Sequence, residues 1–433
     1  MGHAAAEIMD PGERERAQLE RLRRTVRRVA AVPFYRDALA ERGVLPDDLT
    51  CLADLRTLPF TTKDDLRRGY PFGFLTVPRE EIVRVHTSSG TTGKPVVAGY
   101  TRQDLDLWAE VMARTLRCAG VDQRDVLHNA YGYGLFTGGL GFHLGAEAVG
   151  ATVVPASGGV TKRQVMLLVD LGATVLTCTP SYALVIAETA REMGVDLRRD
   201  GALRVGIFGA EAWSGGMHRQ LEEQLGLEAF DIYGLTEIIG PGVAVECSAH
   251  QGLHIAEDHF LPEVVDPDTG EPLAEGETGE LVLTTLTKEG MPLLRFRTRD
   301  RTALHRGKCA CGRTLVRMDP IRGRTDDMLV VRGMNLFPSQ VEELLLADPA
   351  VGSNYLLVVE RKENRLDQLE IQVELHPEAW AAGEESRGRH EHRLSFELRG
   401  RLGISARVVA KEPGSLPRSE GKAKRVADRR ELG

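Results

Sequence analysis

The sequence lacks long apolar runs and is poor in cysteine and aromatic residues. Its 433 residues include six cysteines, and aromatic residues make up 5% of the chain. No apolar run approaches the roughly 18 residues that a membrane-spanning helix needs, so we expect no such helix. The start of the chain has no apolar core and carries acidic residues, which predicts neither a secretory signal nor a transit peptide. Few cysteines without secretory features indicate reduced thiols and a cytoplasmic location.

Positive charge is not in excess either. The formal net charge is −8, with 42% hydrophobic and 27% charged residues. This balance offers no footprint for nucleic acid or for an anionic membrane surface, so neither is expected as a partner. The composition is that of an ordinary globular protein, and at roughly 100–200 residues per domain the length predicts about two to four domains or subdomains.

The larger part of the chain alternates short apolar runs with helix-length segments. An amphipathic helix is predicted over 13–30, with apolar residues three to four apart and an Arg-rich face that we expect to be solvated. Strands are predicted at 151–155, 173–180, 203–211 and 280–287. The first three are separated by helical patterns, which is typical of the βαβ units of an α/β domain. Turn-rich residues 259–305 predict an antiparallel β section.

The character of the chain changes near GRTDD, residues 323–327. A helix is predicted over 339–346, followed by two strand-like runs, a helix that opens with the charged segment 384–394, and a final strand. These elements describe a small α+β unit of roughly 100 residues. We therefore predict two domains, residues 1–326 and 327–433, with the boundary at Asp326.

The strongest local motif is the loop HTSSGTTGKPVVAGYT, residues 86–101. Its glycines and hydroxyls leave backbone N–H groups open to polyphosphate oxygens. It is not a Walker A loop, because Gly90 and Gly93 are two residues apart and Pro95 follows Lys94. From the glycines alone, a flexible polar loop is an equal alternative. The candidate phosphate ligands are Ser88, Ser89, Gly90, Thr91, Thr92, Gly93 and Lys94.

Three further motifs carry polar groups, and each is unremarkable alone. The turn Tyr233–Glu237 ends in a carboxylate, which beside a phosphate loop is a natural ligand for Mg²⁺. Asp300 ends the run RFRTRD and can accept hydrogen bonds from ribose hydroxyls, and Arg324 can meet phosphate or ribose. Lys422 lies in the C-terminal turn LPRSEGKAKR. Read singly, these residues are more often turn, surface ion-pair or solvated residues.

Taken in order, SSGTTGKP, YGLTE, TRD, GRTDD and the C-terminal GK resemble the adenylate-forming superfamily of acyl-CoA and aryl-CoA synthetases. Further segments, among them LPFTTKDDLR, NAYGYGLFTGGLGFHLGAE, IFGAEAWS, GLHIAEDHF and LTTLTKE, are similar to the phenylacetate–CoA ligase family. The resemblance runs from about residue 18 to the end of the chain. It implies the adenylate-forming fold, with a large N-terminal domain of α/β sheets plus a small β section and a small mobile C-terminal α+β domain.

The resemblance implies a two-step reaction. ATP and a carboxylic acid give an acyl-adenylate and pyrophosphate, and coenzyme A then gives a thioester and AMP. Lys422, Glu237 and Thr236 are the implied catalytic residues: Lys422 bridges carboxylate and α-phosphate, Glu237 holds Mg²⁺, and Thr236 contacts the α-phosphate. Asp300 and Arg324 meet the ribose or phosphate, and Asp326 is the hinge about which the C-terminal domain turns. The implied frame of the adenine consists of Gly209, Ala210, Glu211, Asp231, Ile232, Tyr233 and Gly234.

The acid pocket is predicted in the aromatic and glycine-rich run after residue 128. Tyr131, Tyr133 and Phe136 supply rings that can stack on an aryl substrate, with Gly138 and Gly139 leaving room. The alternative is that these aromatic residues belong to the core.

A zinc site is predicted from Cys247, His254, Cys309 and Cys311, since thiolates and imidazole suit tetrahedral Zn²⁺. His250 has the more common spacing from Cys247, whereas the family likeness favours His254. The alternative is a set of reduced thiols near a turn.

Other functions stay open at this level. The acyl acceptor is coenzyme A or the thiol of a carrier protein acting in trans, and a noncatalytic paralogue is disfavoured because Glu237, Asp300, Asp326 and Lys422 are all present. The acid is phenylacetate-type, with benzoate- and anthranilate-type acids as alternatives. The resemblance also implies a homodimer.

Overall fold

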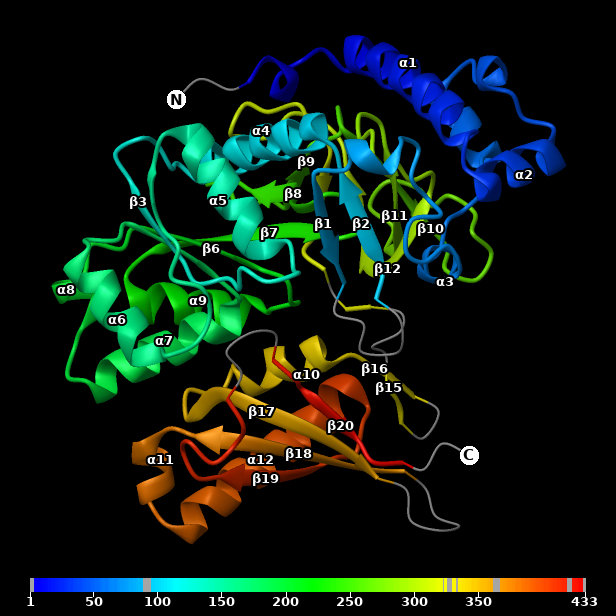
Figure 1. Cartoon of the computed structure of the whole chain (residues 1–433). Helices are drawn as coiled ribbons and strands as arrows, with labels where there is room; N and C mark the ends of the chain where they lie inside the picture. The colour runs from blue at the N-terminus through cyan, green and yellow to red at the C-terminus, as the bar shows by residue number, and fades with distance from the viewer. Residues whose placement is uncertain are drawn as a thin grey trace.

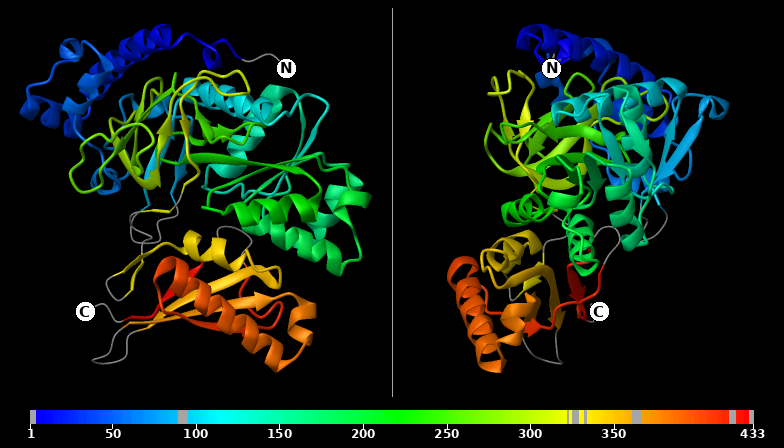
Figure 2. Two further views of the ribbon diagram at one scale, coloured as in Figure 1. Left: turned by 180° about the vertical axis from the view of Figure 1, so that it is seen from behind. Right: turned by 90° about the vertical axis from the view of Figure 1, so that its left-hand side faces the viewer.

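The chain folds into two unequal parts, one above the other in Figure 1. The structure, a computed structural model, describes residues 4–88, 95–321, 323–324, 329–331, 334–360, 367–418 and 423–430. The N-terminal helices lie on the side of the larger part that faces away from the C-terminal part, as both views of Figure 2 show. In the described residues no helix is long and apolar enough to cross a membrane.

The larger part is a mixed α/β structure. Its helices are η1 (Ala5–Glu7), α1 (Pro11–Val29), α2 (Pro33–Arg42), η2 (Pro46–Asp48), η3 (Leu52–Thr57), α3 (Lys63–Arg68), η4 (Arg79–Glu81), α4 (Arg102–Cys118), α5 (Gly138–Val149), α6 (Thr161–Asp170), α7 (Pro180–Glu192), α8 (Leu197–Asp200) and α9 (Gly215–Leu225). Its strands are β1 (Arg84–Thr87), β2 (Val97–Tyr100), β3 (Val126–Asn129), β4 (Thr152–Val154), β5 (Val175–Cys178), β6 (Val205–Gly209), β7 (Glu228–Leu235), β8 (Gly240–Glu246), β9 (Leu253–Ile255), β10 (Phe260–Val265), β11 (Gly279–Thr285), β12 (Phe296–Thr302), β13 (Leu304–His305) and β14 (Arg317–Met318).

A nine-stranded sheet organises this part, in the order β13-β14-β9-β8-β7-β6-β5-β3-β4. Strands β4, β3, β5, β6 and β7 run parallel, and β7 to β13 pair antiparallel. The parallel strands β5 and β6 are buried along their whole length, as expected for strands that helices cover on both faces. The predicted strands at 151–155, 173–180 and 203–211 are therefore confirmed as β4, β5 and β6.

The predicted antiparallel section is also present. Strands β10, β11 and β12 form a separate three-stranded antiparallel sheet, and β1 and β2 form a two-stranded ribbon. The ribbon leads into and out of the glycine-rich loop, with Thr87 opposite Val97.

Helix α1 has a capping residue at its start and a buried apolar face, as its sequence pattern predicts. Asp10 caps α1 by accepting hydrogen bonds from the backbone N–H groups of Gly12 at 2.9 Å and Glu13 at 3.2 Å, and Pro11 opens the helix. Leu22, Val26 and Val29 are fully buried in the main core, which confirms the predicted amphipathic helix.

The C-terminal part has its own hydrophobic core, which runs from Leu329 to Val408. Strands β19, β18, β17 and β20 form one sheet in that order, next to the hairpin of β15 and β16. The elements are β15 (Leu329–Val331), β16 (Met334–Leu336), α10 (Pro338–Leu345), β17 (Val351–Glu360), β18 (Gln368–Leu375), α11 (Pro377–Ala381), α12 (Glu384–Leu402), β19 (Arg407–Lys411) and β20 (Val426–Asp428). The predicted α+β unit is thus present, while the boundary at Asp326 lies outside the described residues.

Candidate active site

Most of the predicted nucleotide residues gather at the carboxyl ends of the parallel strands. Strand β3 has β4 on one side and β5 on the other, so the connections leave in opposite directions between β3 and β5. Ligands of open α/β sheets bind at such a switch point, outside the carboxyl ends of the strands. Residues that follow β3, β6 and β7 are those singled out from the sequence, and the sheet brings them to one edge.

The segment Gly209–Glu211 forms the rim of this edge. A Cβ atom at Gly209 would overlap the backbone carbonyl oxygen of Ile232, so only glycine lets β6 and β7 approach here. Ala210 adopts a left-handed conformation with φ +70°. The Glu211 carboxylate accepts hydrogen bonds from the backbone N–H of Ser181 at 2.8 Å and of Ala423 at 2.9 Å.

Tyr233, Asp300 and Arg324 form a connected group. The Tyr233 hydroxyl donates to Asp300 Oδ2 at 2.6 Å, and Arg324 Nη1 donates to Asp300 Oδ1 at 3.1 Å. Burial and the neighbouring Asp300 raise the pKa of Tyr233 well above its usual value, so the phenol stays protonated and donates. The group presents a buried carboxylate flanked by a hydroxyl and a guanidinium, which suits a ribose diol.

The remaining residues of the predicted adenine frame lie along β7. Burial raises the pKa of the Asp231 carboxyl to about 7, and the nearby Glu246 carboxylate adds to the shift. Ile232 is buried. At Gly234 a side chain would overlap the backbone of Gly240, so this glycine is required by the close turn between β7 and β8.

The turn that holds Thr236 and Glu237 follows β7. The Glu237 carboxylate is buried, and its Oε1 lies 3.3 Å from the ammonium Nζ of Lys63 at the start of α3. Lys63 was not singled out from the sequence, although it belongs to the LPFTTKDDLR segment that carries the family likeness.

A second lysine, Lys288, contacts the backbone of the same turn. Lys288 is 2% exposed, and its ammonium donates to the backbone carbonyls of Ile238 at 2.7 Å and Glu237 at 3.3 Å. It also lies 4.9 Å from the centre of the Tyr100 ring. Burial lowers the pKa of Lys288 to about 8, against the attraction of Asp104 and Glu237. Lys288 belongs to LTTLTKE, one of the segments that carry the family likeness, and this was the sequence signal that could have found it.

Of the predicted glycine-rich loop, the structure describes the base at Ser88. Ser88 lies at the base of the glycine-rich loop, where its hydroxyl accepts a hydrogen bond from the Val96 N–H at 3.0 Å. The other loop residues, Ser89 to Lys94, lie outside the described residues, as do the hinge Asp326 and Lys422.

The three predicted acid-pocket aromatics have different surroundings. The Tyr131 ring stacks on Phe142 with centroids 5.2 Å apart, and its hydroxyl donates to the Gly209 carbonyl at 3.3 Å. The Tyr133 hydroxyl accepts from Asn129 Nδ2 at 2.7 Å, whereas Phe136 is largely exposed. The space above Gly138, predicted to leave room for substrate, faces the ring of Tyr131 instead.

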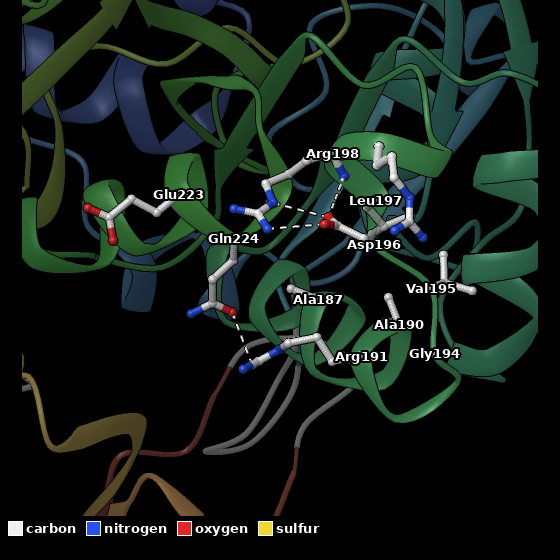
Figure 3. A pocket seen from close by; sticks show the side chains of 11 residues that line it. Ala187, Ala190, Arg191, Gly194, Val195, Asp196, Leu197, Arg198, Glu223 and Gln224 are labelled. Atoms are coloured by element: carbon white, nitrogen blue, oxygen red, sulfur yellow. Dashed lines mark hydrogen bonds and ion pairs between the residues drawn. The ribbon is translucent and has the colours of Figure 1, made fainter. Parts of the chain in front are cut away.

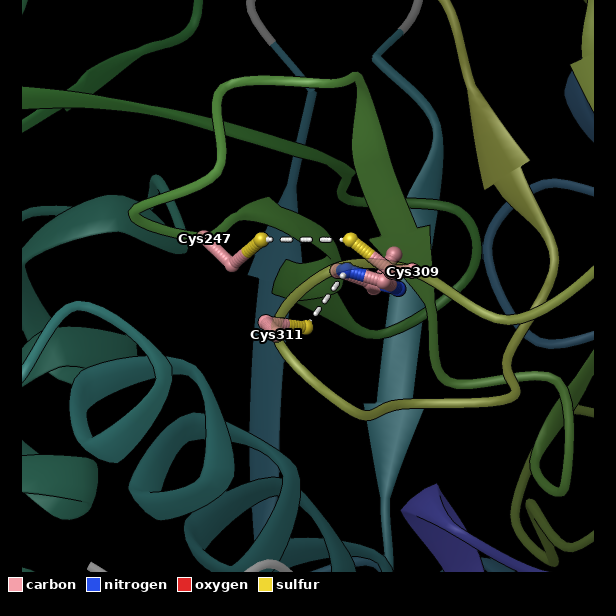
Figure 4. A group of neighbouring side chains, drawn as sticks. Cys247, Cys309 and Cys311 are labelled. Atoms are coloured by element: carbon pink, nitrogen blue, oxygen red, sulfur yellow. Dashed lines mark hydrogen bonds between the residues drawn. The ribbon is translucent and has the colours of Figure 1, made fainter.

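Cys247, His254, Cys309 and Cys311 converge from the turn after β8, from strand β9 and from the loop after β13. Figure 4 shows the three cysteine side chains of this cluster close together. Their donor atoms all lie within 4.8 Å of one another, with Cys247 Sγ 3.8 Å from Cys309 Sγ and Cys311 Sγ 3.4 Å from His254 Nε2. Because β8 runs antiparallel to β7, its end at Cys247 lies at the edge of the sheet opposite the nucleotide residues.

His250 does not join this cluster. Its Nδ1 lies 3.2 Å from Glu246 and its Nε2 lies 3.3 Å from Glu228. With His218 and Glu246 it forms a separate group of imidazoles and carboxylate.

One cavity lies beside α7, and another lies between the two parts of the chain. The cavity of Figure 3, about 410 Å³, is lined by small and charged residues of α7, α8 and α9, including Arg191, which donates to Gln224 at 3.3 Å. Among the predicted site residues that the structure describes, none lines this cavity. A second cavity of about 420 Å³ lies between the two parts of the chain, with Glu211 on one side and Tyr355 and Ala423 on the other.

Comparison with known proteins gives two family matches. Residues 35–286 match the model of the AMP-binding enzyme family, and residues 333–430 match that of the AMP-binding enzyme C-terminal domain.

The chain is also similar to curated proteins over nearly its full length. It is 54% identical to the phenylacetate-coenzyme A ligase of Thermus thermophilus, covering 97% of this chain and 98% of that protein. It is 49% identical to the phenylacetate-coenzyme A ligase of Escherichia coli, covering 97% and 96%.

Among solved structures, the fold is similar to that of a 2-hydroxyisobutyryl-CoA ligase. In its postadenylation state with 2-HIB-AMP, that enzyme matches with a TM-score of 0.92 at 30% identity, covering 98% of this chain and 91% of that one. In its thioesterification state the TM-score is 0.73 at 31% identity, covering 99% and 92%. The arrangement of the two parts therefore resembles the postadenylation state more closely.

Proposed function

The chain belongs to the phenylacetate–coenzyme A ligase family of AMP-binding enzymes, and from this we propose that it is an AMP-forming ligase that joins a phenylacetate-type acid to coenzyme A. The observation that carries the proposal is the full-length likeness to phenylacetate-coenzyme A ligases. The convergence of Tyr233, Asp300 and Arg324 at the carboxyl edge of the sheet supports the nucleotide site.

In the first step, a carboxylate oxygen of the acid attacks the α-phosphorus of ATP, the bond to the β-phosphate breaks, and pyrophosphate leaves. Asp300 and Arg324 hold the ribose, and Gly209 to Glu211 with Tyr233 frame the adenine. Thr236 contacts the α-phosphate. Lys422 holds the attacking carboxylate in line with the α-phosphate, which lowers the entropic barrier.

Glu237 fits Mg²⁺, because a buried carboxylate at this edge is a ligand type that Mg²⁺ uses together with phosphate oxygens. When bound, the ion neutralises phosphate charge during the attack. The Lys63 ammonium, 3.3 Å from Glu237, adds positive charge to the same place. Ser88 closes the base of the glycine-rich loop, whose N–H groups and hydroxyls complete the phosphate site.

In the second step, the sulfur of coenzyme A attacks the acyl carbon, the bond to AMP breaks, and the thiol proton is released. The C-terminal domain, residues 327–433, turns about Asp326 between the steps and removes Lys422 from the site. The likeness to two states of one ligase that differ in fit to this chain supports such a rotation.

The acid is aromatic in this proposal. Tyr131 stands after β3, with its hydroxyl on the Gly209 carbonyl, between the adenine rim and the start of α5. Tyr133 and Phe136 complete the wall of the pocket. One methylene in an apolar pocket discriminates by about 1–3 kcal/mol, so benzoate- and anthranilate-type acids are the relevant competitors.

A structural Zn²⁺ joins the turn that carries Cys247, the strand β9 with His254, and the loop that carries Cys309 and Cys311. A tetrahedral ion with bonds of about 2.3 Å to sulfur and 2.0–2.1 Å to nitrogen separates sulfur from sulfur by about 3.8 Å and sulfur from nitrogen by about 3.5 Å. The distances of 3.8 Å and 3.4 Å fit these values. Bound there, the ion crosslinks these segments and takes no part in the reaction.

The protein is further proposed to be a cytoplasmic homodimer. Light scattering tests the dimer, and a monomer mass would contradict it.

The deciding experiment measures pyrophosphate release with MgATP and a panel of aryl acids, followed by thioester formation with coenzyme A or with a phosphopantetheinyl carrier protein. We expect phenylacetate to give pyrophosphate and a coenzyme A thioester. Thioester formation with the carrier alone, or no pyrophosphate with any aryl acid, would contradict the proposal.

A further inference from the structure

We propose that Glu188 and Arg418 form a latch that, with Glu211, holds the C-terminal domain in the orientation for adenylate formation. Glu188 is then a positioning residue for the first half-reaction. This inference rests on the proposed function, because it concerns the same two-step reaction. The contacts of Glu188 and Glu211 with the C-terminal part must break before the second step.

The Arg418 guanidinium pairs with two carboxylates, one from each part of the chain. It donates to Glu374 Oε1 and Oε2 at 2.7 Å and 2.8 Å, and to Glu188 Oε1 and Oε2 at 3.1 Å and 3.2 Å. Glu374 lies on β18 in the C-terminal part and Glu188 on α7 in the larger part. Two-oxygen pairing of a guanidinium is the strong, directional form of an ion pair.

The two pairs differ in burial. The Glu374 side chain is 4% exposed and also accepts the Leu416 N–H at 2.6 Å, whereas the Glu188 side chain is 35% exposed. Glu374 therefore fixes the guanidinium within the C-terminal part. Rotation of that part leaves Arg418 with Glu374 and separates it from Glu188, so Glu188 contributes to one orientation only.

A second contact between the two parts lies five residues after Arg418, at Ala423, and its acceptor is the Glu211 carboxylate. This carboxylate accepts the Ser181 N–H from α7 and the Ala423 N–H from the C-terminal part. Ala423 directly follows Lys422 in the sequence. Arg418 and Ala423 thus attach both ends of the segment that carries the lysine to one region of the larger part, around α7.

The overall arrangement agrees with this assignment. The two parts stand as in the ligase structure in the postadenylation state, and less closely as in the thioesterification state. The latch contacts are therefore present in an adenylation-type arrangement. A ligand or contact can bias a two-state equilibrium only through such a difference between the states.

The test compares Glu188→Gln with Glu192→Gln, which changes an exposed carboxylate on the same helix. Single-turnover pyrophosphate release without coenzyme A reports the first half-reaction. Thioester formation from a supplied acyl-adenylate reports the second. We expect Glu188→Gln to slow the first about five- to tenfold and to leave the second unchanged or faster, with Glu188→Asp closer to the native enzyme. Glu192→Gln should change neither.

An equal loss in both half-reactions, or no change in either, would overturn the latch. Hydrogen exchange gives a readout that needs no turnover: peptides containing Ala423 should exchange faster in Glu188→Gln than in Glu192→Gln, and equal exchange would also overturn the proposal. A native enzyme that releases no pyrophosphate contradicts the proposed function, whereas the exchange result still decides the latch.

Discussion

Lys288 is a lysine whose ammonium group is buried beside the turn that carries Glu237. A fully buried ammonium is costly unless it is hydrogen-bonded, and here the donors meet the carbonyls of Glu237 and Ile238. The turn that carries Glu237 is thus held by the buried ammonium of Lys288, and the ammonium of Lys63 lies 3.3 Å from the Glu237 carboxylate. The two lysines have separate consequences.

Replacing Lys288 by Met changes how stability depends on pH. Burial lowers the pKa of Lys288 to about 8, below its unfolded value of about 10.4. The unfolded state therefore binds more protons between these pH values, and the free energy of unfolding contributed by this group rises with pH across that window. We expect the free energy of unfolding of Lys288→Met, relative to native, to fall by about 3 kcal/mol between pH 8 and 10.5.

Urea unfolding at pH 7, 8, 9 and 10 measures this difference. Lys162→Met, which changes an exposed lysine, should show no trend with pH. A constant offset between Lys288→Met and the native protein would contradict a buried, titrating Lys288.

Glu237→Gln should weaken magnesium use rather than folding. The change removes one carboxylate charge and keeps the shape, so we expect pyrophosphate release to fall about 10²–10³-fold at low magnesium. The magnesium concentration for half-maximal rate should rise. Lys63→Met removes the facing ammonium, and its effect should be smaller, about tenfold, with no shift toward higher magnesium. An unchanged magnesium dependence in Glu237→Gln would reject its assignment.

At the scale of elements, tight approaches between neighbouring strands shape the nucleotide rim. At Gly209, the last residue of β6, a side chain would overlap the backbone carbonyl oxygen of Ile232 on β7. The same edge receives the N–H of Ser181 at the start of α7 and the hydroxyl of Tyr131 after β3. The rim is therefore built by residues at or after the ends of three strands, β3, β5 and β6.

Gly209→Ala should disturb this rim. The added methyl group meets backbone that has no free space, so we expect a loss of stability of about 1–3 kcal/mol together with weaker ATP binding. Gly388→Ala, on α12 where nothing lies within 4 Å of the new methyl, should be neutral or stabilising. Thermal unfolding and nucleotide titration measure both. Unaltered stability in Gly209→Ala would show that β6 and β7 can separate here.

The cysteine cluster, which consists of Cys247, His254, Cys309 and Cys311, links segments that are far apart in the sequence. Cys309→Ser should abolish zinc binding, lowering the bound metal from about one per chain to none. Unfolding free energy should fall by about 4 kcal/mol where zinc exceeds its dissociation constant a thousandfold. Elemental analysis and thermal unfolding measure these effects.

His250→Ala is the matched control for the zinc site, because His250 lies with Glu246 and Glu228 rather than with the cysteines. Zinc lost from His250→Ala and kept in His254→Ala would reverse the ligand assignment.

At the scale of the whole molecule, each part has a core of its own, and polar contacts join the two parts. Leu346, which follows α10, is an apolar exception, because it packs into a core cluster of the larger part. Glu342 of α10 accepts the N–H of Ser214 in the larger part at 3.0 Å, and within the C-terminal part it accepts the Tyr355 hydroxyl at 3.1 Å. Such polar contacts, unlike a shared apolar core, can be exchanged for others when one part rotates. This is what a two-step ligase with one site for both reactions needs.

Lys422→Ala should separate the two half-reactions. In the proposed mechanism its ammonium acts only while the carboxylate attacks the α-phosphate, so the substitution should cost about 3–4 kcal/mol of transition-state stabilisation for pyrophosphate release. Thioester formation from a supplied acyl-adenylate should stay near normal. Lys424→Ala is the control and should change little. Near-normal pyrophosphate release, or an equal loss in both steps, would reject this role.

The sequence by itself determined the elements and their class. Apolar periodicity located α1 and the strands β4, β5 and β6 to within a few residues, and the order of short motifs identified the family. It also brought out Asp300, Arg324 and Tyr233, which the structure joins by hydrogen bonds. These features are local, since a helix face, a turn or a motif is written in consecutive residues.

Only the tertiary structure decided which distant residues meet. Lys63 reaches Glu237, and Arg418 reaches Glu188. For the cysteine cluster, spacing along the chain favoured His250 and the family likeness favoured His254, the predicted ligand. The structure places His254 with the cysteines, on strand β9, which pairs antiparallel with β8. Such encounters depend on strand order and on the packing of one part against another, and these arise from the sum of many contacts that no single segment of sequence contains.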